Sequence, residues 1–160
     1  MKILYYLPVK KRYISKWDFY KPDIDALNET EELKVVNTFL EFIYNFLFYD
    51  LVFCMWWHRS VVPIFISRIF KKKVICSGAI HFKDNSGEKT WFNSSKIYRL
   101  TNLISLKLTN YNIFVSKQQF RDFKKILGIK NGYLLTLKIN KSLEKKLNTK
   151  YPKKISKKRN

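Results

Sequence analysis

Glycine is scarce in this sequence, with four among 160 residues. Loops that cradle phosphate groups are built from closely spaced glycines, and neither GxGxxG nor GxxxxGKS/T occurs here. The zinc-peptidase pattern HExxH and the nucleophile elbow GxSxG are missing as well. The sequence therefore excludes these common cofactor-binding and catalytic motifs, and it offers no metal-ligand cluster.

Cysteine is also rare. Cys54 and Cys76 both lie within apolar runs, and neither has metal-ligand spacing. The apolar core near the start of the chain is too short for the hydrophobic region of a secretory signal. We therefore expect buried free thiols in a protein of the reducing cytoplasm.

No long uninterrupted apolar run is present either. The most apolar stretch, residues 39–57, contains Glu41, Asn45 and Asp50. A charge is costly at the centre of a bilayer, so a helix followed by a strand explains this stretch better than a membrane span does.

Acidic residues are few, with 12 Asp and Glu against 32 Lys and Arg, a net charge of +20. From residue 138 to 159 there are ten basic residues and one acid, Glu144. Such a surplus favours polyanionic partners, which include nucleic acid, an anionic membrane surface and phosphorylated substrates. We expect a folded domain over 1–137 and a Lys-rich, partly disordered tail over 138–160, for which a merely solvated role is the alternative.

Short apolar runs alternate with amphipathic stretches along the domain, which predicts alternating strands and helices. Because the runs lack polar alternation, we expect strands that are buried on both faces, as in a parallel sheet. The predicted fold is a single α/β domain, Rossmann-like, with a doubly wound, mainly parallel sheet in three layers. The predicted strands are 3–7, 33–36, 51–55, 74–77, 113–115 and 133–137.

Helix signals separate these runs. Thr38 with Glu41, and Ser116 with Gln119, each have the spacing of a capping box. Ser60 is expected to cap a helix that carries Pro63 in its first turn. Residues 10–20 show no helical period and are expected to form a loop. Apolar residues recur at helical spacing on two of the helices, as Phe39, Phe42, Ile43 and Phe46, and as Val62, Phe65, Ile66 and Ile69.

Polar and aromatic residues follow the strands, and in an open parallel sheet ligands bind at the strands' carboxyl ends. Trp56 and Trp57 come directly after the third strand and can form a stacking wall for a sugar ring or a base, with His58 beside them. The alternative is that one tryptophan belongs to the core and the other packs on the next helix.

Other strand ends carry further candidates. Gly78 and Ala79 are small enough to let a ligand approach the backbone, and the imidazole of His81 can bond a phosphate or sugar hydroxyl or relay a proton. Asp18, next to Trp17 in the first loop, can act as a base toward an acceptor hydroxyl. The remaining candidates are Arg99, at the start of a helix that suits anions, and Ser116, after the fifth strand.

Several segments together resemble a known group of enzymes. KILYYLP, WDFYKPDIDALNE, YDLVFCMWWHRSVVPIFISRIFKKKVICSGAIH and NYNIFVSKQQFRDFKKILGI are similar to the N-terminal domain of GT-B glycosyltransferases of the family-four (group one) kind. The resemblance spans residues 1–137. Glycines usual in that family's first loop are replaced here by Pro8-Val9-Lys10.

The resemblance implies transfer of a sugar from a nucleotide-sugar donor to a glycan or lipid-linked acceptor, without a permanently bound cofactor or metal. It implies that the N-terminal domain receives the acceptor and that His81 lies near the donor phosphates or the transferring sugar. The family's donor-binding domain has no counterpart in these residues, so we expect the chain alone to be inactive or to need a separately encoded partner domain. We expect it in the cytoplasm, peripherally at the inner membrane surface. The alternative function is a small basic nucleic-acid-binding protein without catalysis.

Overall fold

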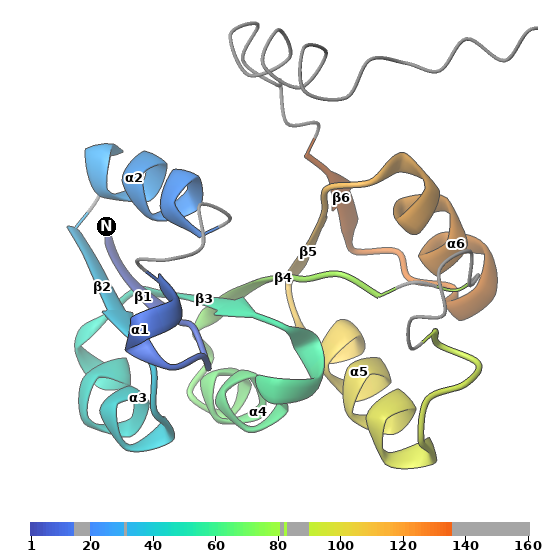
Figure 1. Cartoon of the computed structure of the whole chain (residues 1–160). Coiled ribbons are helices and arrows are strands. Elements are labelled where there is room, and N and C mark those ends of the chain that lie inside the picture. The colour runs from blue at the N-terminus through green and yellow to red at the C-terminus, as the bar shows by residue number, and fades with distance from the viewer. Residues whose placement is uncertain (15–19, 31, 81, 83–89, 136–160) are drawn as a thin grey trace, which may run out of the picture.

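Six strands, each parallel to its neighbours, form one sheet in the order β2-β1-β3-β4-β5-β6 (Figure 1). This computed structural model describes residues 1–14, 20–30, 32–80, 82 and 90–135. The predicted doubly wound, Rossmann-like α/β fold is confirmed. The strands are β1 (Lys2–Tyr6), β2 (Glu32–Val36), β3 (Leu51–Met55), β4 (Lys73–Ser77), β5 (Tyr111–Phe114) and β6 (Gly132–Leu134).

Helices cover both faces of the sheet. The short α1 (Lys11–Ile14) and α2 (Lys21–Thr30) lie on one face, where Ile24 and Leu27 pack on a core that includes Tyr5 and Phe53. A larger core lies on the other face, under α3, α4, α5 and α6 (Figure 1). These four helices are α3 (Phe39–Asn45), α4 (Val61–Ile69), α5 (Lys96–Leu108) and α6 (Lys117–Leu127).

The central strand shows why the apolar runs predict this architecture. All five residues of β3 are buried, because β1 and β4 flank the strand and both of its faces are covered. Cys54 and Cys76 are opposite each other on β3 and β4, and both are buried free thiols, as expected. The edge strands β2 and β6 keep exposed residues, as strands with one neighbour do.

Local capping signals are mostly borne out. Thr38 and Glu41 form the predicted capping box of α3, and Gly128 ends α6 in the left-handed conformation at φ +63°. Ser60 precedes α4, but its hydroxyl donates to the Met55 carbonyl at 2.7 Å and caps nothing. Ser116 accepts a hydrogen bond from the Gln119 amide, while the Gln119 side chain turns elsewhere, so the second box is only half formed.

One expectation about the helices is wrong, and one helix has an orientation that the sequence did not indicate. Residues 11–14 form α1, where a continuous loop was expected. On α4, Pro63, Ile64 and Ser67 face the core, whereas Val62, Phe65 and Ile69 point outward and are about half exposed or more. This helix is apolar almost all round, so periodicity alone could not tell which side faces the sheet.

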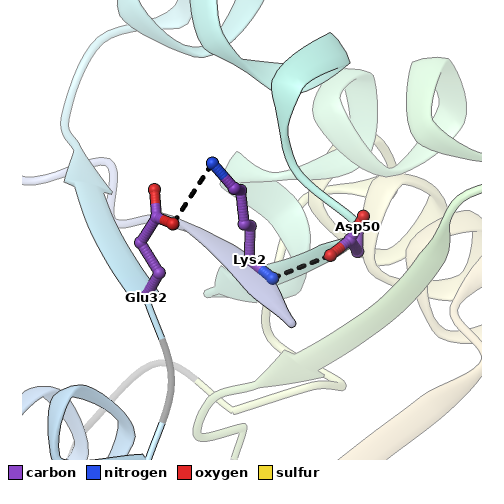
Figure 2. A network of polar contacts seen from close by, with 3 residues as sticks. All are labelled: Lys2, Glu32 and Asp50. Atoms are coloured by element: carbon purple, nitrogen blue, oxygen red, sulfur yellow. Dashed lines mark hydrogen bonds and ion pairs between the residues drawn. The ribbon is translucent and has the colours of Figure 1, made fainter.

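The amino ends of the strands carry a small exposed polar network (Figure 2). The Lys2 ammonium lies 3.2 Å from a carboxylate oxygen of Glu32, and the Lys2 amide donates to the Asp50 carboxylate at 2.8 Å. These contacts tie β1 to the starts of β2 and β3. They are exposed to solvent and contribute little to stability. No helix within the described part of the chain is both long and apolar enough to cross a bilayer.

Candidate functional site

A pocket of about 750 Å³ opens at the carboxyl ends of β1 and β3. The chain leaves β1 for β2 on one side and later returns to place β3 on the other side of β1, so the strand order reverses between these two strands. In open parallel sheets this reversal creates the crevice in which ligands bind. The pocket is lined by Pro8, Val9, Lys10, Tyr13, Tyr20, Trp56, His58 and Arg59.

Trp56 forms the wall of this pocket and has an unusual backbone. Its φ of +66° and ψ of +94° lie in a region that L-residues rarely adopt. Its amide donates to the Ser77 carbonyl at 2.8 Å, and its indole nitrogen donates to the Tyr20 hydroxyl at 3.2 Å. Strained residues of this kind cost about 1–3 kcal/mol and are concentrated at functional sites. These two hydrogen bonds fix Trp56 in its strained conformation, which makes it the leading candidate for a functional residue in this pocket.

The strain at Trp56 can be measured by comparing two truncations. Glycine normally destabilises a protein relative to alanine. At positive φ the order reverses, because glycine lacks the β-carbon whose steric clash destabilises alanine there. We expect Trp56→Gly to be more stable than Trp56→Ala by about 1 kcal/mol in urea unfolding. At the exposed helical position Lys107, the same pair of substitutions should show the usual order. Alanine being the more stable residue at both positions would contradict the strain.

Cationic groups stand beside the aromatic wall. Arg59 donates to the Pro8 carbonyl at 3.2 Å, which ties the end of β3 to the loop after β1. Lys10 is exposed on the same loop, and the Arg12 guanidinium lies 5.0 Å from the centre of the Tyr13 ring. None of the described residues that line the pocket is acidic, so it suits a ligand that carries phosphate groups as well as an apolar face.

His58 completes this side of the pocket. Partial burial, and then the neighbouring Arg59 charge, lower the pKa of His58 below its usual value. The imidazole is therefore neutral at neutral pH and can both donate and accept a hydrogen bond. Its ring lies 4.7 Å from that of Tyr98 on α5, and burial raises the pKa of Tyr98.

Trp57, expected beside Trp56 in a stacking wall, belongs to the core. Its side chain is 1% exposed, and its indole nitrogen donates to the Asn112 side-chain oxygen at 2.8 Å. Its ring packs against Phe114 and Phe123. The Trp57 carbonyl accepts a further bond at 2.7 Å from the Ser105 hydroxyl. The two tryptophans thus point to opposite sides of the sheet, and only Trp56 lines the pocket.

Gly78 packs against Trp57 and does not line the pocket. A β-carbon there would lie 3.1 Å from two ring atoms of Trp57, so the missing side chain makes room for the indole. The loop after Gly78 is held by Gln119, whose side-chain nitrogen donates to the carbonyls of Gly78 at 3.3 Å and Ile80 at 3.4 Å. Sequence reasoning assigned Gln119 only to a helix cap and missed this positioning role. Ala79 does not line the pocket.

The remaining candidates lie elsewhere. Arg99 is in the first turn of α5, and Ser116 uses its hydroxyl to cap α6, and neither lines the pocket. Trp17, Asp18 and His81 are outside the described residues. The structure therefore brings together Trp56 and His58 of the predicted set.

The pocket also contains residues that sequence reasoning did not single out as site residues. Tyr13 and Tyr20 flank the part of the first loop that held two predicted site residues, and Lys10 and Arg59 supply the charge. The polar residues His58-Arg59-Ser60, which follow Trp57 at the end of the strand, were the available signal for Arg59. Within the described residues, no group of three or more His, Cys, Asp or Glu side chains is placed to hold a metal ion.

Comparison with known proteins yields a likeness of fold. No protein-family model matches the sequence, and no curated protein matches it. The crystal structure of Anabaena Alr3699/HepE in complex with UDP is similar, with a TM-score of 0.53 at 15% sequence identity. The likeness covers 94% of this chain and 50% of that one, so the chain spans about half the length of that structure. At this identity it is the fold that the two proteins share.

Proposed function

We propose that this chain is the acceptor-side domain of a glycosyltransferase, and that the pocket between the ends of β1 and β3 receives a sugar-bearing substrate. The observation that carries the proposal is the position of Trp56, a strained aromatic residue that lines a large pocket at the point where the strand order reverses. The resemblance to GT-B glycosyltransferases and the fold shared with a protein that binds UDP support the same conclusion.

Each part of the pocket has a role in sugar handling. The C–H face of a sugar ring stacks on a flat aromatic wall such as Trp56, and the buried Tyr20 hydroxyl holds the indole in position by accepting a hydrogen bond from its nitrogen. Arg59 and Lys10 offer cationic donors to a phosphate, on a nucleotide-sugar donor or on a phosphorylated acceptor. Sugar transfer removes a proton from the attacking acceptor hydroxyl, and the neutral His58 imidazole can accept it. Asp18 and His81 remain proposed participants.

Direct binding tests the proposal. Ligand-detected NMR of the full chain against UDP-glucose, UDP-N-acetylglucosamine and a panel of oligosaccharides would identify a binder, and titration calorimetry would give its affinity. We expect Trp56→Ala to weaken binding about tenfold, the usual cost of losing one stacking surface. Phe65→Ala, which truncates an exposed aromatic residue on α4 away from the pocket, is the matched control and should leave the affinity unchanged.

The same variants distinguish the alternative function. Under this alternative, the chain binds double-stranded DNA with an affinity that falls steeply with salt and is unaffected by Trp56→Ala. That result would favour the nucleic-acid-binding hypothesis. Failure of every sugar and nucleotide sugar to bind the full chain would overturn the proposed role of the pocket.

A further inference from the structure

The outer sides of α3, α4 and α5 are apolar where a water-facing helix is normally polar. Each helix contributes two large side chains that are more than half exposed, and together these six define what we call the outer helix face. They are Leu40 (68%) and Tyr44 (75%) on α3, Phe65 (52%) and Ile69 (60%) on α4, and Ile97 (75%) and Leu100 (57%) on α5. Apolar patches that extend over several elements mark sites of interaction.

The three helices lie side by side beneath the sheet, so their exposed residues belong to one surface (Figure 1). Phe42 of α3, Ile64 of α4 and Leu106 of α5 share one buried core cluster, which fixes the opposite sides of all three helices as the outside. The ring centroid of Phe70, directly after α4, lies 5.1 Å from that of Phe46, directly after α3. The two rings therefore pack between these helices. The face is therefore continuous from α3 to α4.

The charge around α4 and α5 is mainly positive. Between residues 51 and 121 the sequence contains two carboxylates, Asp84 and Glu88, neither of which belongs to α4 or α5. Lys71 and Lys73 follow α4 and are exposed, as are Lys96 and Lys107 of α5.

The α3 side differs, because it carries two acids, Glu41 and Asp50. Glu41 accepts hydrogen bonds from the amides at the start of its own helix, and Asp50 accepts one from the Lys2 amide. Hydrogen bonds from neutral amides leave both carboxylates charged, so the cationic part of the outer helix face is the side formed by α4 and α5.

We propose that the outer helix face docks the domain onto an anionic phospholipid bilayer. Aromatic and aliphatic side chains that enter the interface, together with lysines that meet anionic headgroups, are the two contributions that hold interfacial helices on membranes. A second copy of the chain fits less well, because two such cationic faces repel each other. Nucleic acid fits less well too, because leucine and isoleucine offer nothing to a phosphate backbone. The proposal does not depend on the sugar-handling pocket.

Vesicle co-sedimentation of the full chain tests this docking. We expect binding to vesicles of equal parts phosphatidylglycerol and phosphatidylcholine, and weaker binding to vesicles of phosphatidylcholine alone. The triple variant Phe65→Gln, Ile69→Gln and Leu100→Gln should bind the mixed vesicles about tenfold more weakly. Because these residues are exposed, the substitutions should not impair folding, and circular dichroism and urea unfolding would verify this.

Two matched variants show whether the binding resides in the outer helix face. Tyr133→Gln with Leu135→Gln removes exposed apolar side chains at the opposite end of the sheet, and should leave vesicle binding unchanged. All variants keep the Lys-rich residues 138–160, so a difference in vesicle binding between them is caused by the substituted residues and not by the tail. Trp56→Ala should bind vesicles as the unmodified chain does. The membrane proposal and the proposed function can therefore fail independently of each other.

Three outcomes would overturn the proposal. One is the absence of binding to the mixed vesicles by the unmodified chain. Another is equal binding by the triple variant. The third is a concentration-dependent dimer that the triple substitution abolishes, which would assign the face to a second copy of the chain.

Discussion

Replacing Trp57 with alanine should lower the free energy of unfolding by about 3–5 kcal/mol, the usual range for removing a buried tryptophan. The ring is packed between Phe114, Phe123 and the backbone at Gly78, so neighbouring groups have little freedom to fill the cavity. The substitution also leaves the Asn112 oxygen without its donor in the core, which adds a desolvation penalty. Urea unfolding followed by circular dichroism measures the difference.

Two further variants separate packing from hydrogen bonding at this site. Trp57→Phe keeps an aromatic ring but lacks the donor, so it should cost less than alanine and still leave the Asn112 side-chain oxygen without its donor. Phe65→Ala removes an exposed aromatic side chain and should change stability by less than about 0.5 kcal/mol. A loss at Trp57 no larger than that at Phe65 would show that the indole is not the centre of the larger core.

Alkaline pH should destabilise the protein through its two thiols. Burial raises the pKa of Cys54 and of Cys76 well above the ordinary thiol value, so both stay protonated in the folded state while the unfolded chain ionises. Each thiol then contributes its full stability below about pH 8.5 and loses it as the pH rises, by about 2 kcal/mol per thiol at pH 10. The pair should therefore account for a loss of about 4 kcal/mol between pH 7 and pH 10.

The measurement is urea unfolding at both pH values, with a reductant present, for the unmodified chain and for Cys54→Ala with Cys76→Ala. The double variant keeps every tyrosine and lysine, so the difference between the two pH dependences isolates the thiols. Equal pH dependences, or rapid alkylation of either cysteine in the folded protein at pH 8, would contradict their burial.

The sequence allowed most of the sheet to be predicted, because strands buried on both faces leave uninterrupted apolar runs. β3 is the clearest case, with the predicted and observed bounds identical. Edge strands were located less well, since partly exposed residues in β6 blur the end of the run. The α4 helix was predicted, but its orientation was not, because apolar residues surround it on nearly all sides.

The site was only partly predictable, for a reason visible at Trp56 and Trp57. Two identical neighbouring residues differ in role because the backbone turns through positive φ at the first of them, and no sequence pattern indicates that turn. Tyr20 and Arg59 join the pocket through contacts with Trp56 and Pro8 that link distant parts of the chain. The Gln119 contacts behind the β4 loop are long-range as well, and a helix-cap pattern at the same residue concealed them.

The Ser105 and Ser60 hydroxyls hold the turn that carries Trp56 and His58 against the core from two sides, through the carbonyls of Trp57 and Met55. A ligand that reaches this turn meets a surface whose shape is set before it arrives, so little conformational entropy is spent on ordering the protein during association. Most of the interaction free energy between a ligand and Trp56 should therefore contribute to the affinity. Amide protons of the turn should accordingly exchange with solvent slowly even when the pocket is empty.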